Sequence, residues 1–377
     1  MTSWVDWAAD QSVALHRAGR WRTVVDLDGP GPTTRLLDAV TGGHRDVVSF
    51  AGNDYLGLAR HPAVVAAAHE AIDRCGTGAG AARLLAGARP VHRELEEALA
   101  DWKGAEQAVL FPTGYAANLG VMAALGDSGV RIVSDERNHA SVVDGCRLAR
   151  AEVVVFPHGD LAAAERALAG AERALVVSES VFSMDGDVAA VDDLAALCSR
   201  TGALLVLDEA HGVLGPDLSA PPADLLLMRV GTLSKTLGSL GGYVAGSADL
   251  CDLIVNRARP FIFTTAPPPA AAAAALAAVA VCRSAEGDEL RRRLRSNVKR
   301  IAPGHRSPIV AVVVGDEYAA LAASAALLER GLFVPAIRPP TVAPDTSRLR
   351  ISLSALHTPA HLEALVSALQ ELDVVTA

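Results

Sequence analysis

Short runs of branched aliphatic residues alternate with longer amphipathic segments through the middle of the chain. Five such runs lie at residues 108–111, 131–134, 152–156, 174–178 and 203–207. Continuous apolar runs separated by helical segments are typical of parallel strands that are covered by helices on both faces. The pattern predicts an α/β domain with a mostly parallel sheet between helices, and a ligand site beyond the carboxyl ends of the strands.

The pattern differs at both ends of the chain. Near the N-terminus, apolar residues recur at helical spacing at Trp4, Trp7, Ala8 and Val13. Beyond residue 256 the pattern predicts helices over 289–300 and 317–330 and strands over 309–314 and 349–353. We therefore expect an N-terminal arm over 1–45, a large α/β domain over 46–255 and a smaller C-terminal α+β domain over 256–377.

Composition excludes several classes of protein. The 377 residues carry a net charge of −9 and no basic tail, which argues against nucleic-acid binding. The five cysteines are widely spaced without companion histidines, so neither a metal site nor a disulfide framework is expected. The N-terminus lacks the basic and apolar blocks of a signal peptide, and the apolar run at 270–281 is too short to span a bilayer. These features predict a cytoplasmic protein with no membrane partner.

Lysine is scarce in this sequence. The 34 basic residues comprise 31 arginines and only three lysines, Lys103, Lys235 and Lys299. Lys103 and Lys299 follow charged helical segments, which predicts solvated side chains. Lys235 instead lies in a run rich in glycine and hydroxyl groups at 230–242. Because only about one lysine amine in 2,500 is free at pH 7, a nucleophilic Lys235 needs an apolar pocket or an imine with an aldehyde cofactor.

The residues around Lys235 match the other parts of pyridoxal phosphate (PLP). Hydroxyl groups of Thr232 and Ser234, with backbone N–H groups of Gly114 and Tyr115 at a helix start, form a candidate phosphate cradle. Further polar residues follow other predicted strands. Asp208 could pair with the pyridine nitrogen, His211 could bond the phenolic oxygen, and His139 could stack on the ring.

Simpler interpretations exist for each of these residues. A lone aspartate at a strand end is usually a helix cap, and a lone histidine is more often structural. The Ser-Lys-Thr sequence also suggests a nucleotide-binding phosphate loop, but Ser234 stands where that motif requires glycine. The combination of Asp208, His211 and Lys235 on one alternating α/β background favours PLP.

Motifs spread over nearly the whole chain closely resemble those of the α-oxoamine synthases, PLP enzymes with the aspartate-aminotransferase fold. The matching segments are Asn53-Asp-Tyr-Leu-Gly57, His92-Arg-Glu-Leu-Glu96, Asn138-His-Ala-Ser141, Ser180-Val-Phe-Ser-Met-Asp-Gly186, Asp208-Glu-Ala-His-Gly212, Thr232-Leu-Ser-Lys235, Arg259-Pro-Phe-Ile-Phe263, Arg338-Pro-Pro-Thr341 and Arg348-Leu-Arg350. The resemblance implies that fold, with a large PLP-binding domain and a smaller C-terminal domain.

The resemblance also implies roles for individual residues. Lys235 would form the imine with the cofactor and move the α-proton of an amino acid. Asp208 would pair with the pyridinium, His211 with the phenolate and His139 with the ring face. The phosphate would be lined by Gly114, Tyr115, Thr232 and Ser234, with Thr265 contributed by the second subunit of a homodimer. Arg350, with Arg348 as the alternative, would bind the substrate carboxylate, and Arg20, Asn53 and Ser183 would complete the substrate side.

The motifs are most similar to the biotin-pathway branch of this family. That similarity implies condensation of L-alanine with a pimeloyl thioester of coenzyme A or of a carrier protein. The alternatives are another α-oxoamine synthase, using glycine or serine with a different acyl thioester, or a phosphate-binding regulatory module that has lost catalysis. The sequence departs from the usual pattern at residues 78–83 and in a short connection over 214–228, which concern the outer wall of the pocket.

Overall fold

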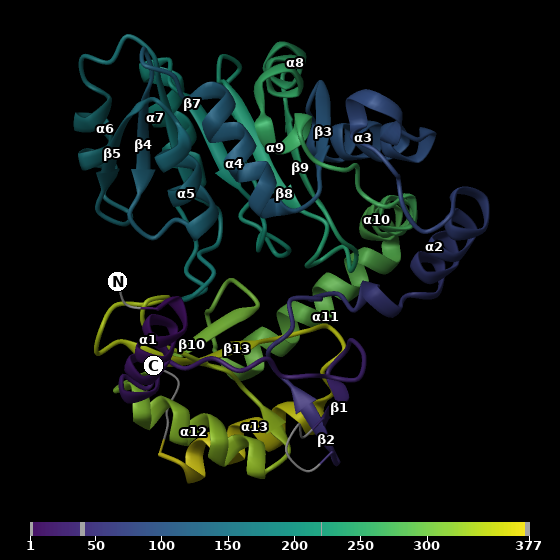
Figure 1. The fold of residues 1–377 in the computed structure, drawn as a ribbon, viewed down its shortest axis with the longest axis vertical. Coiled ribbons are helices and arrows are strands. Elements are labelled where there is room, and N and C mark those ends of the chain that lie inside the picture. The colour runs from purple at the N-terminus through teal and green to yellow at the C-terminus, as the bar shows by residue number, and fades with distance from the viewer. Residues whose placement is uncertain (1–2, 38–41, 220, 374–377) are drawn as a thin grey trace. The chain divides into compact units, whose positions relative to one another are not determined.

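The computed structural model describes residues 3–37, 42–219 and 221–373 (Figure 1). The chain divides into two compact units. The larger unit comprises Asn53–Arg295 and Arg306–Pro308, and the smaller unit comprises Met1–Gly52, Ser296–His305 and Ile309–Ala377.

A seven-stranded sheet organises the larger unit, in the order β3-β9-β8-β7-β6-β4-β5. Its strands are β3 (Gln107–Phe111), β4 (Arg131–Asp135), β5 (Glu152–Phe156), β6 (Ala174–Glu179), β7 (Leu204–Asp208), β8 (Leu227–Thr232) and β9 (Gly242–Gly246). The neighbours from β5 to β8 pair in parallel, whereas β9 is antiparallel to both β8 and β3. The expectation of a mostly parallel sheet is confirmed, and the carboxyl ends of every strand except β9 lie at one edge.

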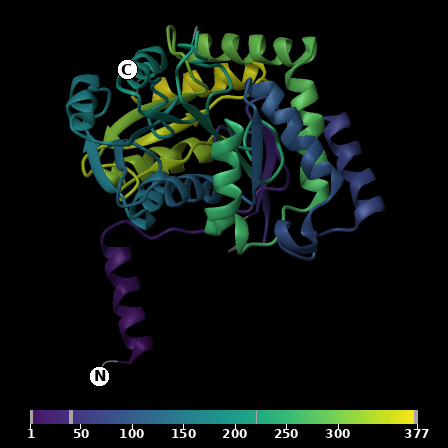
Figure 2. The same ribbon diagram turned by 90° about the horizontal axis from the view of Figure 1, so that it is seen from above.

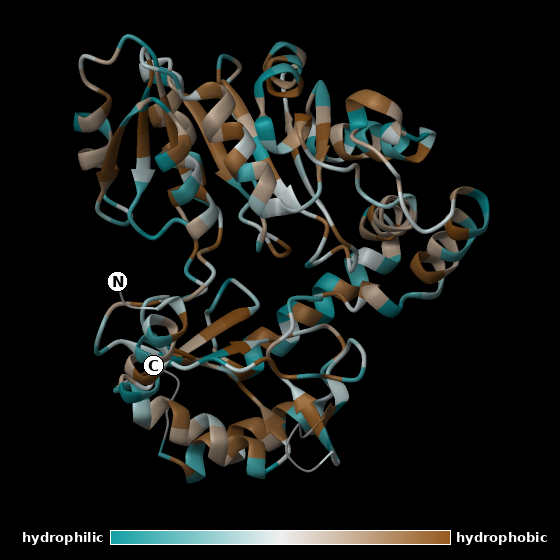
Figure 3. Ribbon diagram, in the orientation of Figure 1, coloured by the Kyte–Doolittle hydropathy of each residue, from teal (hydrophilic) through white to brown (hydrophobic). Residues whose placement is uncertain are grey.

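Helices cover both faces of this sheet. The helices of the larger unit are α2 (Pro62–Cys75), α3 (Pro90–Lys103), α4 (Gly114–Leu125), α5 (Ala140–Leu148), α6 (Leu161–Leu168), α7 (Val191–Thr201), α8 (Ala248–Arg257), α9 (Arg259–Ile262) and α10 (Pro269–Cys282), with short helical turns η1 (Leu58–Arg60) and η2 (Arg83–Gly87). On β4, Ile132 belongs to the apolar cluster formed with α4 and α8, whereas the next residue, Val133, belongs to the cluster formed with α6 and α7. Burial on both faces explains why consecutive residues in the middle of these strands are apolar (Figure 3).

The smaller unit contains two three-stranded sheets, with strand orders β1-β2-β11 and β10-β13-β12. The strands are β1 (Thr33–Leu37), β2 (His44–Ser49), β10 (Ile309–Gly315), β11 (Leu332–Phe333), β12 (Ala336–Ile337) and β13 (Ser347–Ser352), accompanied by α12 (Glu317–Glu329) and α13 (Pro359–Glu371). The N-terminal helix α1 (Trp4–Arg17) has no buried residue and projects from the rest of this unit, as an arm would (Figure 2).

The two units divide the chain differently from the boundaries expected at residues 45 and 255. Strand β2 pairs in parallel with β11, which joins the N-terminal residues to the C-terminal part of the chain. Helix α10 packs against α2 and α3 and therefore belongs to the larger unit. Helix α11 (Ala285–Ile301) begins in the larger unit and ends in the smaller one.

Among the described residues, no single helix is long and apolar enough to cross a bilayer. Helices α10 and α11 meet the criterion only as a pair, and that pair is bent by 78° at its break.

Candidate active site

A cavity of about 230 Å³ lies at the carboxyl edge of the large sheet. It is bounded by Glu179 at the end of β6, Asp208 at the end of β7 and Thr232 at the end of β8. Its lining brings together these residues predicted from the sequence: Gly114, Tyr115, His139, Asp208, His211, Thr232, Ser234 and Lys235. Parallel strand ends converge here, as expected for a sheet of this type.

Lys235 is bonded to a short polar chain within the cavity. Its Nζ lies 2.8 Å from Nε2 of His211, and Nδ1 of His211 lies 2.6 Å from the hydroxyl of Tyr55. The Tyr55 hydroxyl also donates to Oδ1 of Asn53 at 3.1 Å. The predicted residue Asn53 is therefore joined to Lys235 through Tyr55, whose part in the site was not predicted.

A second hydrogen-bonded chain fixes the carboxylate of Asp208. Asn118 donates from Nδ2 to Oδ2 of Asp208 at 2.7 Å, and the backbone N–H of Ala210 donates to Oδ1 at 2.8 Å. The Asn118 amide also donates to Ser141, whose hydroxyl lies 2.8 Å from Nδ1 of His139. The sequence reasoning missed Asn118 and Ser141. For Asn118 the available signal was a single polar residue within an otherwise apolar helix, α4.

The start of α4 and the end of β8 form a cradle suited to phosphate. The hydroxyls of Thr232 and Ser234 lie 2.7 Å apart, and Thr113 caps α4 by accepting from the N–H of Ala116. First-turn N–H groups lack intrahelical acceptors and carry the positive end of the helix dipole, so they attract anions. A Cβ on Gly114 would lie only 3.1 Å from Cβ of Thr232, so glycine lets these two segments approach closely.

Glu179 and His139 in the cavity have shifted pKa values. Burial and the negative charge of Asp208 raise the pKa of Glu179 well above its ordinary value, against the opposing effect of Lys235. Partial burial of the His139 ring disfavours its charged form and lowers its pKa, although one face of the ring stays exposed. The negative charge of Asp208 opposes this shift, and the positive charge of Lys235 adds to it. A neutral imidazole at His139 suits stacking on a flat aromatic ring.

Together these groups fit PLP. An amine, a fixed carboxylate, an imidazole and a phosphate cradle line one cavity, and each matches one part of that molecule. Within the cavity lining, Oδ1 of Asn118 and Oε1 of Glu179 are buried and have no hydrogen-bond partner among the described residues. Buried polar atoms of this kind are normally satisfied, so they indicate a place for a ligand.

The other predicted site residues lie outside the cavity lining. Ser183 is buried in the segment after β6, and Thr265 is exposed, with its backbone paired to Ala82. Asn53 is connected to the site through Tyr55.

The predicted substrate arginines belong to the smaller unit. Arg20 pairs with Glu317 at 3.1 Å, and Arg350 donates to the hydroxyl of Ser352 at 2.8 Å. Both Arg348 and Arg350 are buried on β13, and residues two apart share one face of a strand. Their spacing therefore does not decide which of them binds a carboxylate, and the roles of all three arginines stay predictions.

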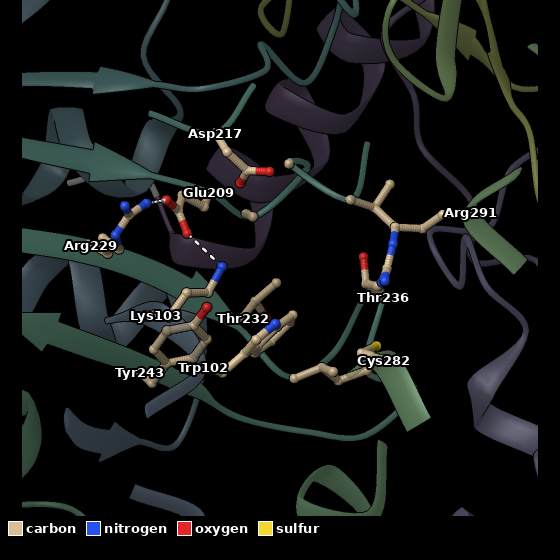
Figure 4. A pocket seen from close by; sticks show the side chains of 14 residues that line it. Trp102, Lys103, Glu209, Asp217, Arg229, Thr232, Thr236, Tyr243, Cys282 and Arg291 are labelled. Carbon is tan, nitrogen blue, oxygen red and sulfur yellow. Dashed lines mark hydrogen bonds and ion pairs between the residues drawn. The ribbon is translucent and has the colours of Figure 1, made fainter. Parts of the chain in front are cut away.

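The expectation that Lys103 is solvated was wrong. Lys103 lines a second cavity of about 340 Å³, next to the first, where Nζ lies 2.7 Å from Glu209 and Arg229 pairs with the same carboxylate (Figure 4). Its side chain is only 17% exposed because the last residue of α3 meets the residue after β7. Burial by itself lowers the pKa of Lys103, but the charge of Glu209 outweighs it and raises that pKa above the ordinary value. Lys103 is therefore a permanently charged structural residue.

Comparisons with known proteins agree with this site. Residues 45–369 match the family described as aminotransferase class I and II. An 8-amino-7-oxononanoate synthase from Anaeromyxobacter sp. (strain K) is 47% identical over 388 residues, covering 97% of this chain and 95% of that protein. The enzyme of the same name from Methylobacterium sp. (strain 4-46) is 48% identical, covering 92% of this chain and 94% of that protein.

A solved structure is similar over the same length. Serine palmitoyltransferase from S. paucimobilis, with a bound PLP–myriocin aldimine, has a TM-score of 0.88 and 30% sequence identity, covering 98% of each chain. The expected PLP-dependent fold is confirmed.

Proposed function

We propose that this chain, which belongs to the 8-amino-7-oxononanoate synthase family within the class I and II aminotransferases, condenses L-alanine with a pimeloyl thioester. The products would be 8-amino-7-oxononanoate, carbon dioxide and the free thiol of coenzyme A or of a carrier protein. The chain is a PLP-dependent transferase, and this reaction places it in biotin biosynthesis.

The observation that carries the proposal is the cavity in which Lys235, His211 and Asp208 meet. Bound PLP supplies an electron sink that makes the α-carbon of an amino acid acidic. Lys235 would hold the cofactor and then remove and return the proton at that carbon. Asp208, oriented by Asn118, would keep the pyridine nitrogen protonated, and His211 would bond the phenolic oxygen.

The remaining residues would bind and orient the ligands. Gly114, Tyr115, Thr232 and Ser234 would hold the phosphate, and His139 would cover one face of the ring. Arg350, or Arg348 in its place, would bind the alanine carboxylate as a bidentate fork. The other expected contributors to the substrate side are Arg20, Asn53 and Ser183, with Thr265 reaching the phosphate of a second copy in a cytoplasmic homodimer.

The second candidate is an α-oxoamine synthase with another amino acid and acyl group. The serine palmitoyltransferase is 30% identical, whereas the oxononanoate synthases from Anaeromyxobacter and Methylobacterium are 47% and 48% identical. The higher identity to the oxononanoate synthases favours alanine and a pimeloyl thioester.

The test is a substrate matrix. PLP-loaded protein is mixed with alanine, glycine or serine, each with pimeloyl-CoA or palmitoyl-CoA, and carbon dioxide and product mass are measured. Alanine with pimeloyl-CoA should give the fastest release and the mass of 8-amino-7-oxononanoate. Faster turnover of another pair would establish the alternative, and release from none of them would favour a regulatory module.

A further inference from the structure

Glu179, the last residue of β6, is a cavity group to which the proposed reaction assigns no role. Its side chain is 2% exposed, and it lines the same cavity as Asp208, His139 and Lys235. The oxygen Oε1 has no hydrogen-bond partner among the described residues, although it is completely buried. A buried carboxyl oxygen without a hydrogen-bond partner destabilises the fold unless a bound ligand supplies that partner.

The carboxyl group of Glu179 lies beside that of Asp208. Glu179 and Asp208 are paired residues of the parallel strands β6 and β7, so their side chains extend from neighbouring positions of the sheet. Both oxygens of Asp208 accept hydrogen bonds, from Asn118 and from the backbone of Ala210. Two adjacent buried carboxyl groups do not both ionise readily, and the better-solvated one keeps the charge.

The protonated form of Glu179 is therefore favoured by its surroundings. Burial is the main cause that raises the pKa of Glu179, and the charge of Asp208 adds to it. Lys235 and the backbone N–H groups of His139 and Ser183 oppose the shift without cancelling it. A protonated carboxyl group is a hydrogen-bond donor, whereas a carboxylate only accepts.

Bound PLP offers one acceptor that suits this donor. Its phosphate is matched by the cradle at α4 and β8, and its ring nitrogen by Asp208, which leaves the phenolic oxygen. His211 is the other residue assigned to that oxygen. A hydrogen-bond donor on Glu179 is therefore matched by the phenolic oxygen of the cofactor.

We propose that Glu179 is a neutral acid in this site and donates a hydrogen bond from Oε1 to the phenolic oxygen of bound PLP. The inference rests on the proposed function, because it takes PLP as the ligand of this cavity.

The experiment compares two substitutions of similar size. Glu179→Gln keeps a neutral donor, whereas Glu179→Leu removes it. The dissociation constant of PLP is measured by titrating each apoprotein, with no acyl donor present. Glu179→Gln should bind PLP within about threefold of the unsubstituted protein, and Glu179→Leu about ten- to hundredfold more weakly, as expected for one hydrogen bond to a charged acceptor.

Ser180→Ala is the matched control. Ser180 is buried next to Glu179 and lies outside the cavity lining, so its substitution disturbs the same strand end without removing a cofactor contact. Its PLP affinity should be unchanged. If Glu179→Gln and Glu179→Leu bound PLP equally weakly, the charged form of Glu179 would be required and the proposal would be overturned. PLP binding by Glu179→Leu at full affinity would also overturn it.

An infrared measurement decides the protonation state even if Glu179→Leu does not fold. At neutral pH the PLP-loaded protein should show the carbonyl band of a protonated carboxylic acid, and Glu179→Gln should lack that band. Identical spectra would overturn the proposal. Neither readout involves condensation, so failure of the substrate matrix and failure of the Glu179 assignment are separate results.

Discussion

Lys235 and Lys103 lie in neighbouring cavities but have opposite surroundings. Lys235 contacts the imidazole of His211, whereas Lys103 is paired with the carboxylate of Glu209. A lysine bound to a buried carboxylate stays charged and is a poor nucleophile. Lys103 and Arg229 both pair with Glu209, so of these two lysines Lys235 is the better candidate for amine chemistry.

Substitution of Lys103 should cost stability. Removing one cation from the Glu209 pair leaves a buried carboxylate with Arg229 alone, so Lys103→Met should lower the free energy of unfolding by about 2 kcal/mol. Lys299→Met is the matched control, because Lys299 is exposed on α11 and should change stability by less than about 0.5 kcal/mol. Urea denaturation of both variants measures the difference; equal effects would contradict the structural role of Lys103.

The sequence predicted several residues that the structure brings together in one cavity, and it missed others that are recognisable only from tertiary contacts. Asp208, His211 and Lys235 follow apolar strands or lie in a glycine-rich run, so pattern alone located them. Asn118 and Tyr55 act through partners far along the chain, 90 and 156 residues away. The Lys103–Glu209 pair likewise joins residues that are 106 positions apart, which no local pattern encodes.

At the scale of elements, the long periodic segments and the continuous apolar strands β3 to β7 were predictable, whereas strands without a continuous apolar run were missed. The predicted helices at 289–300 and 317–330 correspond to α11 and α12, with differences at their ends. Strand β8 was missed because Arg229 and Gly231 interrupt its apolar pattern, and β9 because glycine stands at both of its ends. Strand β1 follows a Gly-Pro-rich connection, and it is recognisable as a strand only from its pairing with β2.

The start of β9 shows why one of these glycines matters. A Cβ at Gly242 would lie 2.4 Å from the carbonyl oxygen of Thr113 and 2.5 Å from the backbone nitrogen of Gly114. Gly242→Ala must therefore displace the N-terminus of α4, which is half of the phosphate cradle. We expect PLP affinity to fall roughly tenfold or more, equivalent to about 1.4 kcal/mol.

Gly78→Ala provides the control for this substitution. Gly78 is exposed, and a Cβ there would meet no atom within 4 Å. Titration of the two apoproteins with PLP measures the effect. If Gly242→Ala bound PLP as tightly as Gly78→Ala, the close approach of β9 to α4 would not be needed for the cradle.

At the scale of the whole molecule, the smaller unit is assembled from both ends of the chain and the larger unit from its middle. The sequence predicted an N-terminal arm and two domains and began the larger domain at residue 46, within β2, because the parallel pairing of β2 with β11 is not visible in local patterns. Within the smaller unit, His357 links these distant segments. It stacks on Phe50 at 4.3 Å and bonds the carbonyl of Ser49 at 3.0 Å.

This contact makes stability depend on pH. Burial lowers the pKa of His357 to about 4 from a model-peptide value of 6.5. The unfolded chain therefore takes up a proton as the pH falls below about 6.5, while the folded chain resists until about pH 4. The stabilisation is fully present above pH 6.5 and decreases towards pH 4, by up to about 1.4 kcal/mol per pH unit.

His357→Gln removes this titration. The free energy of unfolding of the unsubstituted protein should fall more steeply than that of His357→Gln between pH 6.5 and 4.5, a window set by the lowered pKa of His357. His44→Gln, at an exposed position on β2, should follow the unsubstituted protein. Parallel pH profiles for the unsubstituted protein and His357→Gln would show that His357 takes no part in the acid response.

The scarcity of lysine makes the central assignment directly measurable. Borohydride reduction fixes PLP to the amine that binds it, and cleavage after arginine places Lys103, Lys235 and Lys299 in three different peptides. Mass spectrometry should find the pyridoxyl group on the peptide of residues 230–257, which contains Lys235. A pyridoxyl group on the Lys103 or Lys299 peptide instead, or on none of the three, would contradict the account.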